Sequence, residues 1–165
     1  MFTDDFPTGP RGEAIELFGR AFEAQQMEDY AEAIELYQRS IAAYPTAEAH
    51  TFLGWVYSFQ GRHDEAIDEC LEAIRVDPTL GNPYNDIGSY LVAKGNNYDS
   101  VKWFKLALAA TRYEARAYPH MNLARVYEQR NHLLTAARHY GLALEEEPGY
   151  AQAAAALRRL QTRLN

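Results

Sequence analysis

The sequence lacks several features that mark secreted and membrane proteins. It has one cysteine, Cys70, so the chain cannot close an internal disulfide, which is typical of a reducing compartment. It has no run of about 20 apolar residues, the length that a membrane-spanning helix needs. Its N-terminus, with Asp4 and Asp5 close behind Phe2, lacks the basic and then apolar order of a signal peptide. These absences predict a cytoplasmic protein.

Basic charge is also scarce. The 165 residues include 16 lysines and arginines against 23 aspartates and glutamates, which gives a formal net charge of −7. Nucleic-acid affinity depends mainly on neutralising phosphates, and anionic membrane surfaces attract basic segments. The charge therefore disfavours nucleic acid and membranes as partners, whereas a 47% share of apolar residues is enough for a packed core.

The residues of an active site are missing as well. No two of the five histidines are four residues apart on a helix, as a metal-binding face would require. Gly9 and Gly12 lie among prolines with no preceding strand, so they do not form a phosphate loop. Acidic pairs such as Asp4 and Asp5 fall in a tail or at helix ends. We therefore expect no enzyme activity, no cofactor and no metal site, and the lone Cys70 to be a small buried residue.

What the chain does have is a repeated pattern of small residues and prolines. Pro45 and Pro78 are 33 residues apart, Gly54 and Gly88 are 34 apart, and Gly88 and Ala124 are 36 apart. The pattern consists of Ala21, Ala33, Ser40 and Pro45, then Gly54, Ala66, Ala73 and Pro78, then Gly88, Ser100 and Ala107, then Ala124, Ala136, Ala143 and Pro148. A period in this range predicts stacked helix pairs.

Apolar periodicity places these helices and gives an all-α fold. The predicted pairs are 14–27 with 31–43, 47–60 with 64–76, 81–94 with 98–111, and 117–130 with 133–146. In the second pair Gly54 and Ala66 lie where the two helices would cross, because small residues let the backbones approach. Gly61 ends its first helix, and Pro78 prevents its second helix from continuing.

This pattern resembles the tetratricopeptide repeat over about residues 14–148. The resemblance implies a right-handed α-solenoid of about four helix pairs, in units 14–46, 47–80, 81–116 and 117–148. Residues 149–165 carry an apolar stripe and are predicted to form a C-terminal capping helix. The third unit has Arg112 where the family has proline, and about two extra residues precede the fourth, so the turn from Thr111 to Arg116 is expected to be irregular.

Residues 1–13 are predicted to form an extended or disordered tail before the repeats. They contain two prolines and two glycines among acidic residues. An alternative is that Phe2 and Phe6 dock into the aromatic part of the protein's own groove.

The resemblance also implies that the first helix of each unit lines a concave groove. The residues on the groove stripe or beside it are Phe18, Phe22, Thr51, Trp55, Phe59, Asn82, Asn85, Asp86, Ser89, Tyr118, Met121, Asn122 and Arg125. The N-terminal half of this set is aromatic, and the C-terminal half is polar with one guanidinium. Two alternatives stay open: Phe18, Phe22 and Trp55 pack between adjacent units, and the polar residues form an ordinary solvated helix face.

One type of partner is disfavoured by the residues themselves. Chaperone-binding members of the family grip a peptide's terminal carboxylate with lysine, asparagine and arginine, and the matching positions here are Phe18, Phe22, Phe52, Asn82 and Asp86. None of them is a cation. We therefore expect a non-catalytic module that binds a peptide segment or partner helix in its groove, as an adaptor or assembly factor. The alternative is a structural scaffold that associates with copies of itself.

Overall fold

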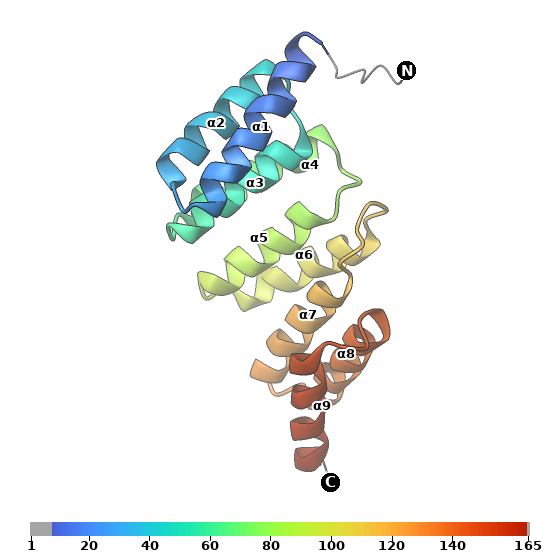
Figure 1. The fold of residues 1–165 in the computed structure, drawn as a ribbon. Helices are drawn as coiled ribbons and strands as arrows, with labels where there is room; N and C mark the ends of the chain where they lie inside the picture. Colours follow the sequence, from blue (N-terminus) through green and yellow to red (C-terminus); the bar gives the residue numbers. More distant parts are fainter. Residues whose placement is uncertain (1–7, 165) are drawn as a thin grey trace, which may run out of the picture. The chain divides into compact units, whose positions relative to one another are not determined.

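The computed structural model describes residues 8–164, and this part of the chain is entirely helical apart from its turns (Figure 1). The helices are α1 Pro10–Gln26, α2 Tyr30–Ala43, α3 Ala47–Phe59, α4 His63–Val76, α5 Asn82–Ala93, α6 Asn97–Ala109, α7 Ala117–Gln129, α8 Leu133–Glu146 and α9 Ala151–Leu164. The all-α fold is confirmed, and each predicted helix is present within four residues of its predicted ends.

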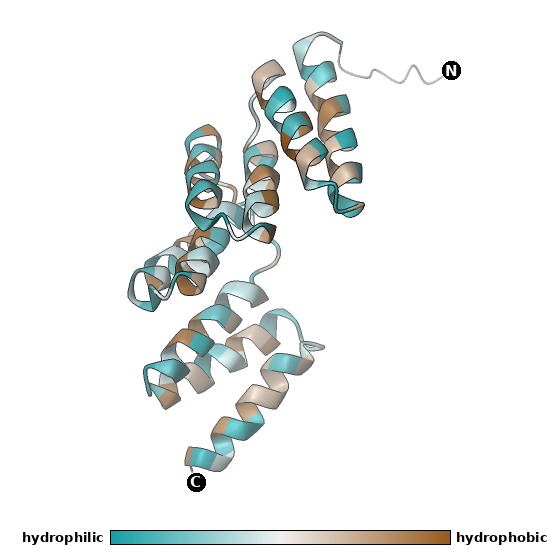
Figure 2. Cartoon of the chain, turned by 90° about the vertical axis from the view of Figure 1, so that its left-hand side faces the viewer, coloured by the Kyte–Doolittle hydropathy of each residue, from teal (hydrophilic) through white to brown (hydrophobic). Residues whose placement is uncertain are grey.

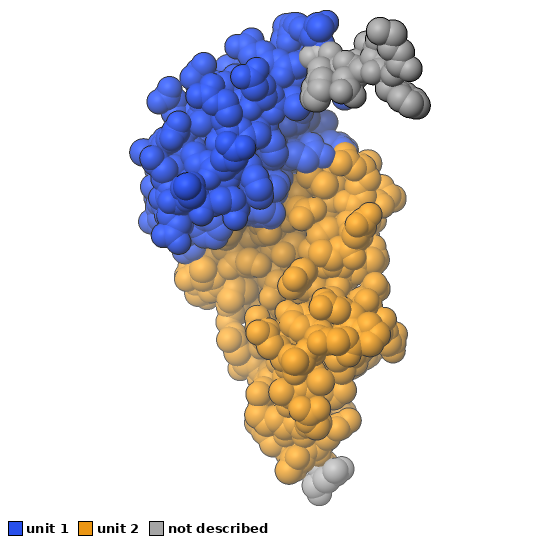
Figure 3. All heavy atoms as spheres, in the orientation of Figure 1, with its two compact units in different colours: residues 1–78 blue, residues 79–165 orange. Residues whose placement is uncertain are grey.

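The helices divide between two compact units, coloured separately in Figure 3. Unit 1 and unit 2 denote these two parts of the chain and not the single repeats. Unit 1 ends at Pro78 and contains α1 to α4, and unit 2 begins at Thr79 and contains α5 to α9. Within the units, α1 packs along α2, α3 along α4, α5 along α6, and α7 along α8. The last helix, α9, packs on α8. Apolar and polar residues share each helix, as Figure 2 shows, so every helix can bury one side against its neighbours.

The same turn joins the two helices of every pair. In each turn one residue has a positive φ: Glu28 at 60°, Gly61 at 75°, Gly95 at 81° and Asn131 at 59°. The amide of the next residue then donates a hydrogen bond to a carbonyl five positions back, for example from Arg62 N to Tyr57 O at 2.9 Å. This is the Schellman arrangement, which satisfies the last carbonyls of a helix while the chain reverses. Gly61 therefore ends its helix as predicted.

Small residues let the paired helices approach. A Cβ added at Gly54 would lie 3.1 Å from the Ala66 carbonyl oxygen, so the predicted crossing of α3 and α4 is confirmed. At Gly88 it would lie 2.5 Å from Cε1 of Phe104, which is itself fully buried. Tyr37, Phe104 and Tyr140 fill equivalent core positions on the second helices, and Cys70 takes that position in the second pair.

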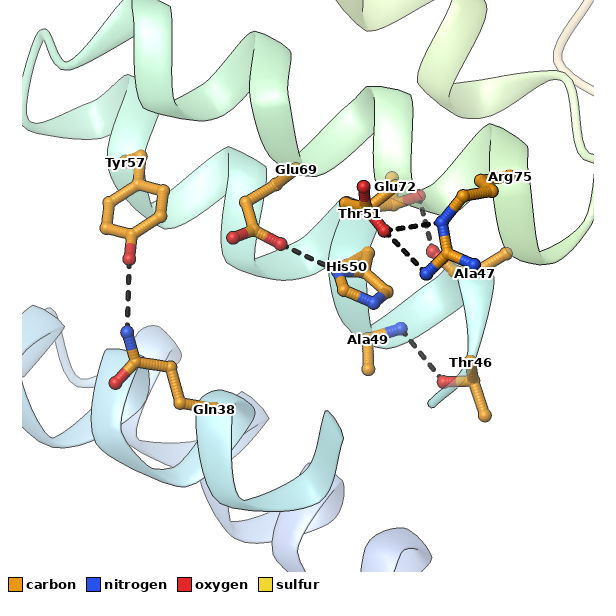
Figure 4. Close-up of polar contacts among 10 residues, drawn as sticks. All are labelled: Gln38, Thr46, Ala47, Ala49, His50, Thr51, Tyr57, Glu69, Glu72 and Arg75. Carbon is orange, nitrogen blue, oxygen red and sulfur yellow. Dashed lines mark hydrogen bonds and ion pairs between the residues drawn. The ribbon is translucent and has the colours of Figure 1, made fainter. Parts of the chain in front are cut away.

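Polar contacts add specificity to the packing of unit 1 (Figure 4). The His50 Nδ1 atom lies 2.7 Å from Glu69 Oε2, which ties α3 to α4. Gln38 Nε2 donates a 3.3 Å hydrogen bond to the Tyr57 hydroxyl, which ties α2 to α3. His50 is 7% exposed, so its side of the contact with Glu69 is shielded from water.

The start of α1 corrects the sequence prediction. Residues 10–13 are helical, so an extended segment at these positions was wrong. Pro10 suits the first turn of a helix, where no amide hydrogen bond is needed, and Glu13 N donates a 3.0 Å bond to Gly9 O. Residues 1–7, with Phe2 and Phe6, lie outside the described part of the chain.

The irregular turn expected from Thr111 to Arg116 has a definite structure in unit 2. Arg112 N donates to Thr79 O at 2.9 Å, and Gly81 N donates to Arg112 O at 3.0 Å, which forms a short parallel bridge. Tyr113 is 7% exposed and packs on Gly81, where an added Cβ would lie 2.3 Å from the Tyr113 Cβ. The extra residues before α7 therefore close over the start of α5.

Candidate functional site

Five aromatic side chains of α1 and α3 lie on unit 1, four of them joined by ring contacts and the fifth, Phe59, in contact with Tyr30 of α2 at 5.8 Å between ring centroids. We call this set the aromatic surface: Phe18, Phe22, Phe52, Trp55 and Phe59. Phe52 is its centre, because its ring centroid lies 5.1 Å from that of Phe18, 5.9 Å from that of Phe22 and 4.3 Å from that of Trp55. The contacts with Phe18 and Phe22 are edge-on, a geometry that aromatic rings favour.

The aromatic surface rests on a buried layer and is open on its outer side. Tyr37 of α2 is fully buried, and its ring lies 5.4 Å from Phe18 and 6.1 Å from Phe52. Phe22 is 41% exposed and Phe59 is 57% exposed. Rings that are packed below and exposed above can give apolar contact at little cost in side-chain freedom.

An apolar cleft of about 220 Å³ continues from Phe18 toward the start of α1. It lies among α1, the end of α2 and the start of α3, and its lining residues are Arg11, Ala14, Ile15, Phe18, Ser40, Tyr44, Thr46 and Glu48. Ile15 is 50% exposed and Tyr44 is 44% exposed. The Arg11 guanidinium lies 5.9 Å from the centre of the Tyr44 ring. Unit 1 therefore presents a continuous apolar strip from Ile15 to Phe22.

The structure corrects one predicted groove residue here and adds one. Thr51 is 2% exposed, and its hydroxyl donates a 2.7 Å bond to the Ala47 carbonyl of its own helix (Figure 4), so it does not face a ligand. Phe52, the next residue, belongs to the aromatic surface instead. The sequence analysis considered Phe52 only as a position without a cation. The signal that could have identified it is an aromatic residue three positions before Trp55 on the same helix.

The polar residues predicted for the groove lie in unit 2, and several of them bond to one another. Asn122 Nδ2 on α7 donates to Asn85 Oδ1 on α5 at 3.1 Å and to Ser89 Oγ at 3.4 Å. The Ser89 hydroxyl donates to the Asn85 carbonyl at 3.1 Å. Asp86 is half-buried on the same helix. This cluster ties α5 to α7, so part of its polarity serves the fold.

The other predicted polar-half residues make no hydrogen bond with this cluster in the described part of the chain. Asn82 lines a cleft of about 560 Å³ formed with the loop before α7. Tyr118 is 50% exposed and meets the edge of Tyr150 at 5.9 Å between ring centroids. Arg125 is exposed on α7 next to the Asn122 cluster.

Met121 is a second correction, because it is 3% exposed and belongs to the core. It packs in one cluster with Ala153, Ala156 and Leu160 of α9. The capping helix covers the face of the last pair that a further repeat would cover, and Met121 lies under it.

A pair of histidines forms a second unusual contact in unit 2. The Nδ1 atoms of His120 and His139 are 3.1 Å apart, and Tyr127 stacks on His139 at 5.5 Å with an interplanar angle of 13°. Burial lowers the pKa of both histidines, and the neighbouring His120, Arg138 and Lys105 add to the effect at His139, whose pKa falls to about 4. Both side chains are therefore neutral at pH 7.

This shift predicts a loss of stability in mild acid. The pKa of His139 is near its ordinary value of 6.5 in the unfolded chain and about 4 in the folded one, so the unfolded chain binds more protons between these values. The free energy of unfolding should then fall as the pH drops from 6.5 toward 4. We expect the melting temperature to fall less between pH 7 and pH 5 in a His139→Gln variant than in the parent. An equal fall in melting temperature in the two proteins would contradict the lowered pKa of His139.

Metal and membrane features are absent from the part of the chain that the structure describes. Among residues 8–164, no three histidine, cysteine, aspartate or glutamate side chains meet in a group that could hold a metal ion. None of the helices α1 to α9 is long and apolar enough to cross a membrane.

Comparison with known proteins finds similarity to one repeat family. Residues 18–80 match the model of the tetratricopeptide repeat. The small glutamine-rich tetratricopeptide repeat-containing protein 2 of Mycosarcoma maydis is 29% identical over 93 residues, which are 56% of this chain. The chain spans only 26% of the length of that relative.

Solved structures share the fold at low sequence identity. PilF of Pseudomonas aeruginosa superposes with a TM-score of 0.86 at 18% identity, covering 94% of this chain and 71% of PilF. The first TPR of Spaghetti (RPAP3), solved with the HSP90 peptide SRMEEVD, gives a TM-score of 0.66 at 24% identity, covering 72% of this chain and 93% of that one. Residues 18–80 therefore match the tetratricopeptide repeat in sequence, and the described chain shares the fold of these solved structures.

Proposed function

We propose that this chain is a non-catalytic protein-interaction module that binds an apolar peptide segment or partner helix on the aromatic surface of unit 1. The observation that carries the proposal is the cluster of aromatic rings around Phe52, with Phe22 and Phe59 exposed. Exposed apolar patches supported by a packed layer are typical of binding surfaces. An adaptor or assembly role and a cytoplasmic location are part of this proposal.

The apolar cleft indicates how such a segment would be held. Its volume of about 220 Å³ is below the range of roughly 300–1,000 Å³ that is usual for small-molecule sites. A single large side chain of a peptide suits it better than a cofactor does. Ile15, Phe18 and Tyr44 would contact that side chain, and the aromatic surface would contact the rest of the segment.

The recognition differs from the gripping of a peptide's terminal carboxylate. The related repeat domain solved with an HSP90 peptide shows that this fold can carry a bound peptide. In the present chain, the positions that supply cations in carboxylate-gripping relatives hold Phe18 in α1 and Asn82 and Asp86 in α5. Apolar contact therefore supplies the affinity at the aromatic surface.

Selection from a random peptide library tests this function. Peptides that bind the parent should be rich in large apolar residues, and a selected peptide should bind at least tenfold more weakly to Phe22→Ser or Phe59→Ser. Both side chains are exposed, so circular dichroism should show unchanged helicity. The control is Leu71→Ser, which removes a 43% exposed leucine from α4 in the same unit.

The outcomes separate the proposal from its rivals. Peptides that bind the double variant Phe22→Ser/Phe59→Ser as well as the parent would refute the aromatic surface as a binding site. Analytical ultracentrifugation of the same variants addresses the scaffold alternative. If the parent associates with concentration and the double variant does not, the occupant of the surface is a second copy of the chain.

A further inference from the structure

A cleft between α7 and the capping helix α9 is rich in arginine, although the whole chain is acidic. It measures about 480 Å³, and its charged lining residues are Arg125, Glu128, Arg159 and Arg163. Three guanidinium groups and one carboxylate leave this cleft with two excess positive charges in a chain of net charge −7. Such a local reversal of sign concentrates anions at the cleft.

The single carboxylate of the cleft, Glu128, already accepts hydrogen bonds from neighbouring side chains. Both oxygens of Glu128 accept hydrogen bonds from Arg159 Nη2 at 2.8 Å, and Oε2 also accepts from the Tyr140 hydroxyl at 2.8 Å. Arg163 Nη1 lies 3.5 Å from Oε1. Burial alone would raise the pKa of Glu128, but the bonds from Arg159 and Tyr140 outweigh it and the net pKa is lowered. Glu128 therefore stays ionised and fixes the position of the Arg159 guanidinium.

Arg125 and Arg163 carry the excess charge. Arg125 is exposed one turn before Glu128 on α7 and makes no hydrogen bond or ion pair with another described residue of the chain. The Arg163 side chain is 51% exposed and shares Glu128 with Arg159. A guanidinium presents several N–H donors in one plane, a geometry that matches a carboxylate. The guanidinium groups of Arg125 and Arg163 can therefore bind an anionic ligand.

Amide side chains extend the site along α7. Arg125 and Gln129 also line a second, smaller cleft of about 140 Å³ together with Ser89 and Asn122. Gln152 of α9 borders the larger cleft. Amides can both donate to and accept from a peptide backbone, so the surroundings of the arginines suit an extended peptide. The net charge of −7 opposes long polyanions such as nucleic acid.

We propose that this arginine cleft binds the aspartate or glutamate side chains of a peptide segment, with Arg125 and Arg163 as the direct contacts. The site lies in unit 2 and does not depend on the aromatic surface of unit 1. The arginine cleft would bind acidic residues of a partner, whereas the aromatic surface would bind apolar residues.

The same random peptide library tests this proposal. Binding peptides are selected separately on the parent protein and on two double variants. Peptides selected on the parent should include a group enriched in aspartate and glutamate. That enrichment should vanish on Arg125→Ala/Arg163→Ala and persist on Phe22→Ser/Phe59→Ser. If the aromatic surface does not bind peptides, the selected peptides should instead lack enrichment in large apolar residues. The two proposals can therefore fail independently.

Fluorescence anisotropy with one selected acidic peptide measures the effect. Binding should weaken at least tenfold with Arg125→Ala, and also when the acidic residues of the peptide are replaced by their amides. It should also weaken as salt is added, because screening reduces the attraction between exposed charges. The matched control is Arg158→Ala, which removes an exposed arginine of α9 that does not line the cleft. No acidic enrichment on the parent, or an equal loss with Arg158→Ala, would overturn the proposal.

Discussion

Replacing Gly88 with leucine is expected to lower the free energy of unfolding by about 3 kcal/mol, at the upper end of the usual cost of overpacking. A single Cβ at this position would already lie 2.5 to 2.9 Å from three atoms of the Phe104 ring. The ring cannot move aside easily, because Phe104 is fully buried and packs with Leu123 and Val126. Urea unfolding followed by circular dichroism measures the loss.

A matched pair of alanine variants separates the clash from helix propensity. Gly141 lies inside α8 of the same unit, and a Cβ added there would meet no atom within 4 Å. Gly141→Ala should therefore stabilise by roughly 0.5–1 kcal/mol, because alanine favours a helix over glycine. Gly88→Ala should destabilise despite the same gain. If both alanine variants stabilise the protein, the close approach of α5 and α6 at Gly88 is wrong.

Much of the fold could be predicted because its signals are local. The small residues at Gly54 and Ala66 and the turn glycine Gly61 act over one helix pair, and their spacing repeats along the chain. The start of α1 was missed because Pro10 reads equally well as a tail residue or as the first residue of a helix. The bridge between Leu80 and Arg112 joins residues distant in sequence and has no sequence signature.

The candidate site was harder to predict, because exposure depends on neighbours that are distant in sequence. Thr51 and Met121 have the correct helical spacing, but one bonds to its own helix and the other lies under α9. Phe52 was missed because its partners Phe18 and Phe22 belong to another helix. The binding role of the residues predicted for the groove stays a prediction.

The arginine cleft escaped the sequence analysis for the same physical reason. Arg125 belongs to the predicted groove stripe, whereas Arg159 and Arg163 lie off the apolar stripe of the capping helix and carry no local signal of a site. The contact of Arg159 with Glu128 spans 31 residues. Only the packing of α9 brings these charges to one place.

The largest effect in unit 1 is expected at Tyr37. Tyr37→Ala should cost about 3–5 kcal/mol of unfolding free energy, the usual range for removing a buried aromatic side chain. Tyr37 is fully buried beneath Phe18 and Phe52, and its hydroxyl donates a 2.8 Å bond to Gln25 Oε1. Because domains of this size are stable by only about 5–15 kcal/mol, the variant should be near its unfolding threshold.

Tyr37→Phe distinguishes the ring from the hydroxyl. It keeps the ring but leaves the 8% exposed Gln25 without its donor, which should cost about 1–3 kcal/mol. Burial raises the pKa of Tyr37 above its ordinary value, so the hydroxyl is a protonated donor at neutral pH. In the double variant Tyr37→Phe/Gln25→Leu the two costs should not add, since both single changes break one bond.

The two Tyr37 variants should also differ in peptide binding. Phe18 and Phe52 lie on the ring of Tyr37 and not on its hydroxyl, so Tyr37→Phe should keep the affinity of a peptide selected for the aromatic surface within about twofold, the change expected when no binding contact is lost. Tyr37→Ala should lose most of that affinity even where circular dichroism shows the chain to be folded. Equal binding by the alanine variant and the parent would show that the surface does not need its buried support.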